Sequence, residues 1–376
     1  MGRYTVACYY FPNYHVDPRN EAAHGPGWTE WELIKRARPR WRGHRQPRVP
    51  VWGYEDEADP AVMAKKIDAA ADHGVDAWIF DWYYYDDGAY LQRCLEEGFM
   101  AAPNAERMRF GLMWANHDWI NIHPCGLQIG RNLQFPGAVT PETFDAITDL
   151  VVERYFAHPS YWCVNGRPYF SIYDLGKFVE GMGGLEPARE ALQAFRAKTV
   201  AAGFSGLELN VVLWSVRVLP SETTVTDPVE MVRYLGFDSI GSYVWIHHVQ
   251  LDSFPETSYT RVMEAAAAHW EETVARYPQP FHPNVTMGWD ASPRTIQSDI
   301  YLNSGYPFMP AMTGNTPARF EEALRRARAF LDQHPELPGI VSLNAWNEWT
   351  EGSYLEPDAD DGMAYLEAIK RVFGDA

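Results

Sequence analysis

The sequence has no apolar run near the ~18 residues that a membrane-spanning helix needs. Its start also lacks a basic segment followed by a separate apolar one, so we expect a cytoplasmic protein, or a periplasmic or secreted one if a signal was removed. Only four cysteines are present, without CxxC or another metal-ligand spacing: Cys8, Cys94, Cys125 and Cys163. These spacings predict free thiols and exclude a disulfide framework, and we expect no metal.

Basic residues are scarce, with 32 Lys and Arg against 50 Asp and Glu and a net charge of -18. Nucleic acid and anionic membrane surfaces both demand cations, so neither is an expected partner. No Gly-rich phosphate loop follows the first predicted strand, which argues against a nucleotide, and we expect no cofactor. No repeat or low-complexity linker divides the chain, so one domain over 1–376 is predicted.

Eight β-rich runs alternate with helical segments along the whole chain. The predicted strands are 4–11, 75–80, 110–114, 168–173, 207–213, 239–244, 284–287 and 339–343, and the predicted helices are 60–73, 90–101, 141–156, 187–202, 228–235, 259–277, 317–331 and 362–373. Pairs such as Thr140-Pro141 and Thr316-Pro317 are typical of helix starts. Because the strands read as continuous apolar runs, they predict an α/β fold, a (β/α)8 TIM barrel with long βα loops at 12–59 and 115–136. A doubly wound sheet is the alternative.

Aromatic residues are abundant, with 15 Trp and 21 Tyr, and polar-aromatic clusters follow almost every predicted strand. The strand ends of a barrel meet at one rim, so these clusters together predict a saccharide-binding cleft. Any single cluster could instead be aromatic packing that fills the rim. The residues assigned to it are Tyr10, Tyr14, Asp81, Trp82, Tyr83, Trp114, Asn116, His117, Trp119, Tyr173, Trp214, Tyr243, Trp245, His247, Trp289 and Asp290.

The last predicted strand runs into the segment Asn344-Ala-Trp-Asn-Glu-Trp-Thr-Glu-Gly352. It places two carboxylates, Glu348 and Glu351, three residues apart, and the motif also contains Trp346, Asn347 and Trp349. Carboxylates perform general acid and base catalysis, and indole faces stack on sugar rings. The segment therefore predicts a site that cleaves glycosidic bonds, rather than a solvated acidic turn.

This motif, with the run 9–13 and the segment that holds Trp28, Glu30 and Trp31, resembles glycoside hydrolase family 99, the endo-α-mannosidases, and in particular its bacterial WbsX-like branch. The resemblance implies a (β/α)8 barrel and metal-free, retaining hydrolysis of an α-linked mannose- or rhamnose-like sugar of a bacterial polysaccharide or glycan. It implies that Glu348 deprotonates the axial 2-hydroxyl, giving a 1,2-anhydro sugar, and that Glu351 is the general acid.

The spacing of the pair agrees with these roles, because side chains at i and i+3 in one turn cannot easily flank the anomeric carbon. We expect a raised pKa for Glu351, through burial beside Trp346 and Trp349 and through the charge of Glu348. Two features of the first loop each allow two interpretations. Glu30 and Glu32 form either a helix entry or a subsite wall. The basic stretch 35–48 either balances acidic neighbours or binds an anionic group of the substrate.

Two other functions compete with hydrolysis. The WbsX label carries a proposal of glycosyl transfer in surface polysaccharide synthesis, and Asp358-Ala359-Asp360 matches the DxD pattern of such enzymes. We interpret these aspartates as the cap of the last helix. A carbohydrate-binding protein without catalysis would not need the paired acids. His247-His248 does not predict a metal site, because adjacent residues point apart on a strand and no acidic ligand is spaced with them, and His247 is interpreted as a hydrogen-bonding subsite residue.

Overall fold

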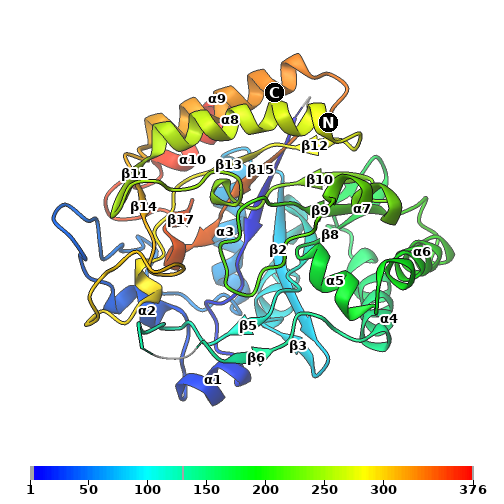
Figure 1. Cartoon of the computed structure of the whole chain (residues 1–376), viewed down its shortest axis with the longest axis horizontal. Coiled ribbons are helices and arrows are strands. Elements are labelled where there is room, and N and C mark those ends of the chain that lie inside the picture. The colour runs from blue at the N-terminus through cyan, green and yellow to red at the C-terminus, as the bar shows by residue number, and fades with distance from the viewer. Residues whose placement is uncertain (1–3, 129–130, 375–376) are drawn as a thin grey trace.

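A computed structural model describes residues 4–128 and 131–374 (Figure 1). Its central sheet is parallel and runs in the order β12-β10-β9-β8-β4-β2-β1-β15-β13. The strands are β1 Thr5–Tyr10, β2 Ala77–Tyr85, β4 Arg109–Trp114, β8 Arg167–Ile172, β9 Glu208–Val212, β10 Ser239–Gly241, β12 Phe281–His282, β13 Asn284–Thr286 and β15 Ile340–Asn344. Only Pro283 separates β12 from β13, which are the two ends of this path, so the sheet closes into the predicted eight-stranded barrel.

Helices surround the barrel because its strands are buried on both faces. They are α3 Pro60–Asp72, α4 Pro141–Leu150, α5 Leu175–Gly181, α6 Leu185–Ala201, α7 Pro228–Leu235, α8 Tyr259–Arg276, α9 Pro317–Gln333 and α10 Ala364–Phe373. The predicted Thr-Pro starts are confirmed: the side chains of Thr140 and Thr316 accept hydrogen bonds from the amides of Thr143 and Arg319. None of the helices among the described residues has both the length and the apolarity to span a membrane.

Two predicted helices differ in the structure. The segment 90–101 forms only the short π-helix η1 Cys94–Phe99, because β3 Gly88–Tyr90 first extends β2 as a hairpin. The last helix begins at Ala364 without a side-chain cap, so the capping interpretation of Asp358 and Asp360 is wrong. Asp358 instead accepts hydrogen bonds from the amides of Asp360 and Asp361 and closes a turn before the helix.

The long loops carry extra elements at the end of the barrel opposite the chain termini (Figure 1). The first loop forms α1 Pro18–His24 and α2 Trp31–Arg36, and the second forms a hairpin of β5 Trp119–Ile120 and β6 Leu133–Phe135. The remaining short elements are η2 Ala105–Arg107, η3 Val151–Phe156, β7 Cys163–Val164, η4 Trp245–His247, β11 Glu256–Ser258, η5 Ser292–Arg294, β14 Ala311–Thr313, β16 Asn347–Glu348, η6 Trp349–Glu351 and β17 Ser353–Tyr354.

Candidate active site

A narrow cavity of about 60 Å³ opens where the barrel strands end. Side chains alternate along a strand, so every second residue near a strand end points into the barrel. Ten of the predicted residues line the cavity: Asp81, Tyr83, His117, Trp119, Tyr173, Tyr243, His247, Trp289, Glu348 and Glu351. The hairpin loop adds Ile120, Ile122 and His123 to the walls, so both predicted carboxylates lie in an aromatic-lined pocket.

Arg294 joins the two carboxylates of the motif. Its Nη1 lies 2.6 Å from Oε1 of Glu351, and its Nη2 lies 3.3 Å from Oε2 of Glu348. The hydroxyl of Tyr306 also donates to Oε1 of Glu351, at 2.7 Å. Glu30 lies behind Arg294 and accepts from its Nε at 3.0 Å. One buried guanidinium thus fixes the pair, and Glu30 is its support rather than a wall of the cavity.

Tyr243 links Glu348 to a third acid. Its hydroxyl lies 2.8 Å from Oδ2 of Asp81 and 3.1 Å from Oε1 of Glu348. A single hydroxyl proton cannot be donated to both carboxylates, so one of the two acids must itself carry a proton when both contacts are hydrogen bonds. Oδ1 of Asp81 and Nε1 of Trp289 are buried without a hydrogen-bond partner among the described residues. They are an acceptor and a donor that a ligand in the cavity can satisfy.

The three acids of this site all have a raised pKa. Burial raises the pKa of Glu348 well above its usual range, and the charge of Glu351 adds to the effect against Arg294. Burial also raises the pKa of Glu351, opposed by Arg294 and by the hydrogen bond from Tyr306. Burial likewise raises the pKa of Asp81. The rise predicted for Glu351 is therefore present, but it is shared with Glu348, so the pair holds protons as a unit.

Glu222 forms another part of the cavity wall together with His247. Its Oε1 accepts from the hydroxyl of Tyr173 at 2.7 Å and contacts Nε2 of His247 at 3.1 Å. Its Oε2 accepts from the amides of Val218 and Leu219, at 2.6 and 3.0 Å. Burial opposes ionisation, but His247 and these donors outweigh it and lower the pKa of Glu222. This wall is therefore a fixed, charged carboxylate that orients His247 and Tyr173.

The other predicted residues do not line the cavity: Tyr10, Tyr14, Trp28, Glu30, Trp31, Trp82, Trp114, Asn116, Trp214, Trp245, Asp290, Trp346, Asn347 and Trp349. The alternation that points Asp81 and Tyr83 inward turns Trp82 outward, where its Nε1 approaches the hydroxyl of Tyr155. Trp114 packs outward in the same way against Phe144. Some of the aromatic residues at the strand ends therefore line the cavity, and the others pack in the layer between the barrel and its helices.

The two tryptophans of the catalytic motif belong to a buried ionic cluster behind it. The indole nitrogens of Trp346 and Trp349 donate to Glu356 at 2.9 and 2.7 Å. Lys66 bridges Glu356 and Glu57, with Nζ at 2.5 and 2.6 Å from their carboxylates. Asn347 donates to Glu57 at 2.9 Å. We infer that this Lys66 cluster holds the motif rigid while Glu348 faces the cavity.

We expect Lys66→Met to lower the free energy of unfolding by about 3–5 kcal/mol, because two buried carboxylates lose their shared cation. Burial already raises the pKa of Glu57 and Lys66 opposes it, so the variant raises it further. The folded state then retains a proton that the unfolded chain releases, and stability falls as pH rises. Denaturant unfolding at pH 5.5 and pH 8 should therefore show the larger deficit at pH 8.

Lys65→Met is the matched control, because Lys65 is the next residue and its side chain, 39% exposed, pairs with Glu55 at the surface. Its expected cost is below about 1 kcal/mol at either pH. Equal losses for the two variants would contradict a stabilising role of the buried cluster.

The basic stretch 35–48 pairs largely within the protein. Arg45 contacts Asp360 and Asp361 at 3.0 Å, and Arg48 contacts Asp360 at 3.1 Å. Asp358 also accepts from the hydroxyl of Tyr354 at 2.6 Å. The structure thus favours the interpretation that these cations balance acidic neighbours. The DxD aspartates are already engaged by the same arginines.

Sequence reasoning missed Arg294, Glu222 and Tyr306. Arg294 follows Asp290 by four residues and could have been found as a cation near a predicted site residue. Glu222 and Tyr306 stand in loops far from any strand end, and no local pattern distinguishes them from surface residues. His44 and Gln46 likewise reach Asp290 across the fold, at 2.7 and 2.8 Å, and together with the other hydrogen bonds they lower its pKa to about 2 against the effect of burial.

The fold defined by these elements is a (β/α)8 barrel, which known glycoside hydrolases share. An endo-α-mannosidase of glycoside hydrolase family 99 from Bacteroides thetaiotaomicron superposes with a TM-score of 0.59 at 14% identity, over 100% of this chain and 97% of that one. A protein described as glycoside hydrolase-like gives 0.59 at 15% identity, over 98% and 94%. A family 1 β-glucosidase from Thermotoga maritima gives 0.51 at 10% identity, over 99% and 98%. These likenesses concern the fold and confirm the predicted barrel.

The chain belongs to the family described as Glycosyltransferase WbsX, whose family model matches residues 6–369. Among curated proteins, it is 28% identical over 386 aligned residues to the uncharacterized protein WxcX from two strains of Xanthomonas campestris pv. campestris. The alignment covers 98% of this chain and 49% of each relative, so the chain spans about half the length of the curated relatives it matches. The resemblance to the WbsX-like branch is thereby confirmed.

Proposed function

We propose that this chain is a retaining glycoside hydrolase that acts through the substrate's own 2-hydroxyl. The observation that carries the proposal is the pair Glu348 and Glu351, buried in the cavity and joined by Arg294. Both carboxylates share one cation and differ in their other partners, Tyr243 for Glu348 and Tyr306 for Glu351. Two acids held on one side of a cavity suit attack by a neighbouring group better than direct attack by a carboxylate across the anomeric carbon.

In the first step Glu348 takes the proton of the 2-hydroxyl, and O2 attacks C1 as the glycosidic bond breaks. Glu351 gives its proton to the leaving oxygen, so the products are a 1,2-anhydro sugar and a free alcohol. In the second step Glu351 accepts a proton from water as the water oxygen attacks C1, and the C1–O2 bond breaks. O2 regains its proton from Glu348, and the anomeric configuration is retained.

The positions of the protons fit these roles. Oε1 of Glu351 accepts from Arg294 and Tyr306, which leaves Oε2 to carry a proton towards a leaving group. Glu348 receives a weaker contact from Arg294, at 3.3 Å, and shares Tyr243 with Asp81. A carboxylate with a raised pKa is a stronger base once ionised, as abstraction of a hydroxyl proton requires.

For the substrate we propose an α-linked, mannose- or rhamnose-like sugar with an axial 2-hydroxyl, in a bacterial polysaccharide or glycan. The superposable enzyme from Bacteroides thetaiotaomicron is an endo-α-mannosidase, and the motif around Glu348 resembles that family. The unpartnered Oδ1 of Asp81 and Nε1 of Trp289 supply polar contacts for sugar hydroxyls within the same cavity.

Glycosyl transfer is the second candidate, because the family description names it. It requires a site for a nucleotide diphosphate, and the sequence feature that matches such a site is the DxD pattern of Asp358 and Asp360. Arg45, Arg48 and Tyr354 already pair with those aspartates. The geometry therefore favours hydrolysis.

The test is to incubate the protein with α-mannosides, α-rhamnosides and bacterial polysaccharides, with and without nucleotide sugars, and to follow the products by NMR. We expect release of a sugar with retained configuration, independent of nucleotide sugars. A matched 2-deoxy or 2-O-methyl substrate should bind and remain intact, because O2 cannot attack. An inverted product, a covalent sugar on Glu348, or reaction only with a nucleotide sugar would contradict the proposal.

A further inference from the structure

A second cavity lies outside the barrel wall, between α7, α8 and strand β10. It has a volume of about 300 Å³, larger than the active-site cavity and within the range of small-ligand sites. Its residues come from separate parts of the chain, including Trp214 after β9, Ser242 after β10, His248 after η4, and Tyr277 after α8. No residue of the catalytic pair lines it.

His248 has the most telling position in this second cavity. Both of its ring nitrogens are buried and lack a hydrogen-bond partner among the described residues. Its ring stacks on that of His269, with centroids 4.0 Å apart. Burial and the neighbouring histidines lower the pKa of His248 well below its usual range, so it is neutral. A neutral imidazole offers one donor and one acceptor, and here neither is used.

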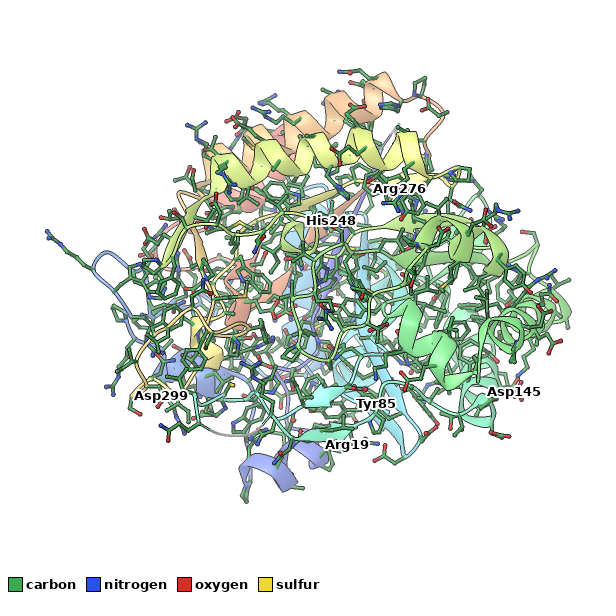
Figure 2. All side chains as sticks on the ribbon, viewed as in Figure 1. Arg19, Tyr85, Asp145, His248, Arg276 and Asp299 are labelled. Carbon is green, nitrogen blue, oxygen red and sulfur yellow. The ribbon has the colours of Figure 1, made fainter. Side chains whose placement is uncertain are left out.

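The charges around the cavity favour a neutral ligand. Figure 2 shows His248 beneath α8 and Arg276 near the end of that helix. Arg276 and Glu272 both line the cavity and carry opposite charges. Glu272 also lies 3.9 Å from Nδ1 of His269. An anion would be attracted by Arg276 and repelled by Glu272, and a cation the reverse, so neither is favoured.

The remaining walls suit a sugar ring. Trp214 and Tyr277 are only partly buried and present aromatic surface, while Ser242 and Thr226 add hydroxyl groups. Sugar hydroxyls both donate and accept, so two of them can satisfy the two unpaired nitrogens of His248. Apolar faces with a few convergent polar groups are the usual composition of such a site.

Trp214 also connects this cavity with the active site. Its ring lies 5.0 Å from that of Tyr173 and 5.5 Å from that of His247, measured between centroids. Tyr173 and His247 both line the active-site cavity. The two cavities are therefore separated by little more than one indole ring.

From this geometry we propose that the cavity between α7 and α8 is a second, non-catalytic binding site for a neutral monosaccharide unit, with His248 as its central hydrogen-bonding residue. A glycan bound there would be held beside the catalytic barrel without being cleaved, because the cavity has only one carboxylate, Glu272, among its lining residues.

The test uses methyl α-mannoside, methyl α-rhamnoside and methyl α-glucoside as probes of the full chain, by ligand-observed NMR titration and by crystal soaking. We expect electron density in this cavity within hydrogen-bond distance of His248. His248→Phe keeps an aromatic ring at this position and removes both nitrogens, and Tyr277→Leu removes an aromatic ring from the cavity wall. Each should weaken binding at this site about tenfold.

His334→Phe is the control, because His334 pairs with Glu271 and Glu336 on the surface and does not line the cavity. It should bind the probes as the unaltered chain does, and so should Asp81→Asn at the second site. Unchanged affinity of both His248→Phe and Tyr277→Leu, or binding of inorganic phosphate in preference to the glycosides, would overturn the proposal. Binding through His248 in a protein that cleaves no glycoside would sustain this site and refute the proposed hydrolysis.

Discussion

Glu348→Gln should lower kcat/KM at least ~10³-fold on every glycoside, including those with activated aryl leaving groups. The reason is that every substrate needs its 2-hydroxyl deprotonated before O2 can attack C1, and an amide cannot accept that proton. The effect of Glu351→Gln should depend on the leaving group of the substrate. Turnover of poor leaving groups should fall ~10²–10⁴-fold, whereas activated aryl glycosides, which leave without a proton, should react nearly normally in the first step.

Initial rates on a matched alkyl and nitrophenyl glycoside pair measure this contrast. Glu367→Gln is the control, since Glu367 lies on exposed α10 surface and should leave both rates unchanged. Both variants at the pair should also keep the unfolding temperature within a few degrees of the parent. Equal loss on both substrates for Glu351→Gln would assign Glu351 a role other than that of general acid.

Arg294→Met should reduce kcat/KM by more than ~10²-fold near neutral pH, because Arg294 is the cation that contacts Glu30, Glu348 and Glu351 together. Arg294 lowers the pKa of both catalytic acids against the effect of burial. Its removal therefore raises both pKa values and keeps Glu348 protonated to higher pH. The acidic limb of the kcat/KM profile should move to higher pH, and the loss should shrink as pH rises.

Arg294→Lys should give an intermediate loss, because lysine keeps the charge and cannot reach three carboxylates at once. Arg40→Met is the control. Arg40 donates to Thr295 and to the carbonyl of Asp299, close to Arg294 in the chain, and contacts neither catalytic acid. A pH profile for Arg294→Met that has the parent's shape, only scaled down, would show that Arg294 does not set the pKa of the pair.

The sequence by itself determined the barrel and the proximity of Glu348 to Glu351, because both depend on short-range patterns. Continuous apolar runs of strand length record burial on two faces, and their alternation with helices leaves few topologies. Strand β12 was not predicted, since His282, Pro283 and Asn284 interrupt the apolar run and the predicted strand began at residue 284. Glu348 and Glu351 stand in one turn after a strand, so their proximity needed no tertiary information.

Only the tertiary structure decided which side chains meet that pair. Arg294 and Glu222 line the cavity and Tyr306 donates to Glu351, and no periodicity relates these three residues to the strand ends. Strand register turned Trp82 and Trp114 outward, and the path of the chain after β15 placed Trp346 and Trp349 against Glu356. A shift of one residue reverses the face on which a side chain lies, and sequence patterns do not locate strand ends that accurately. Long-range charge pairing and register are thus properties of the folded barrel rather than of any segment of the chain.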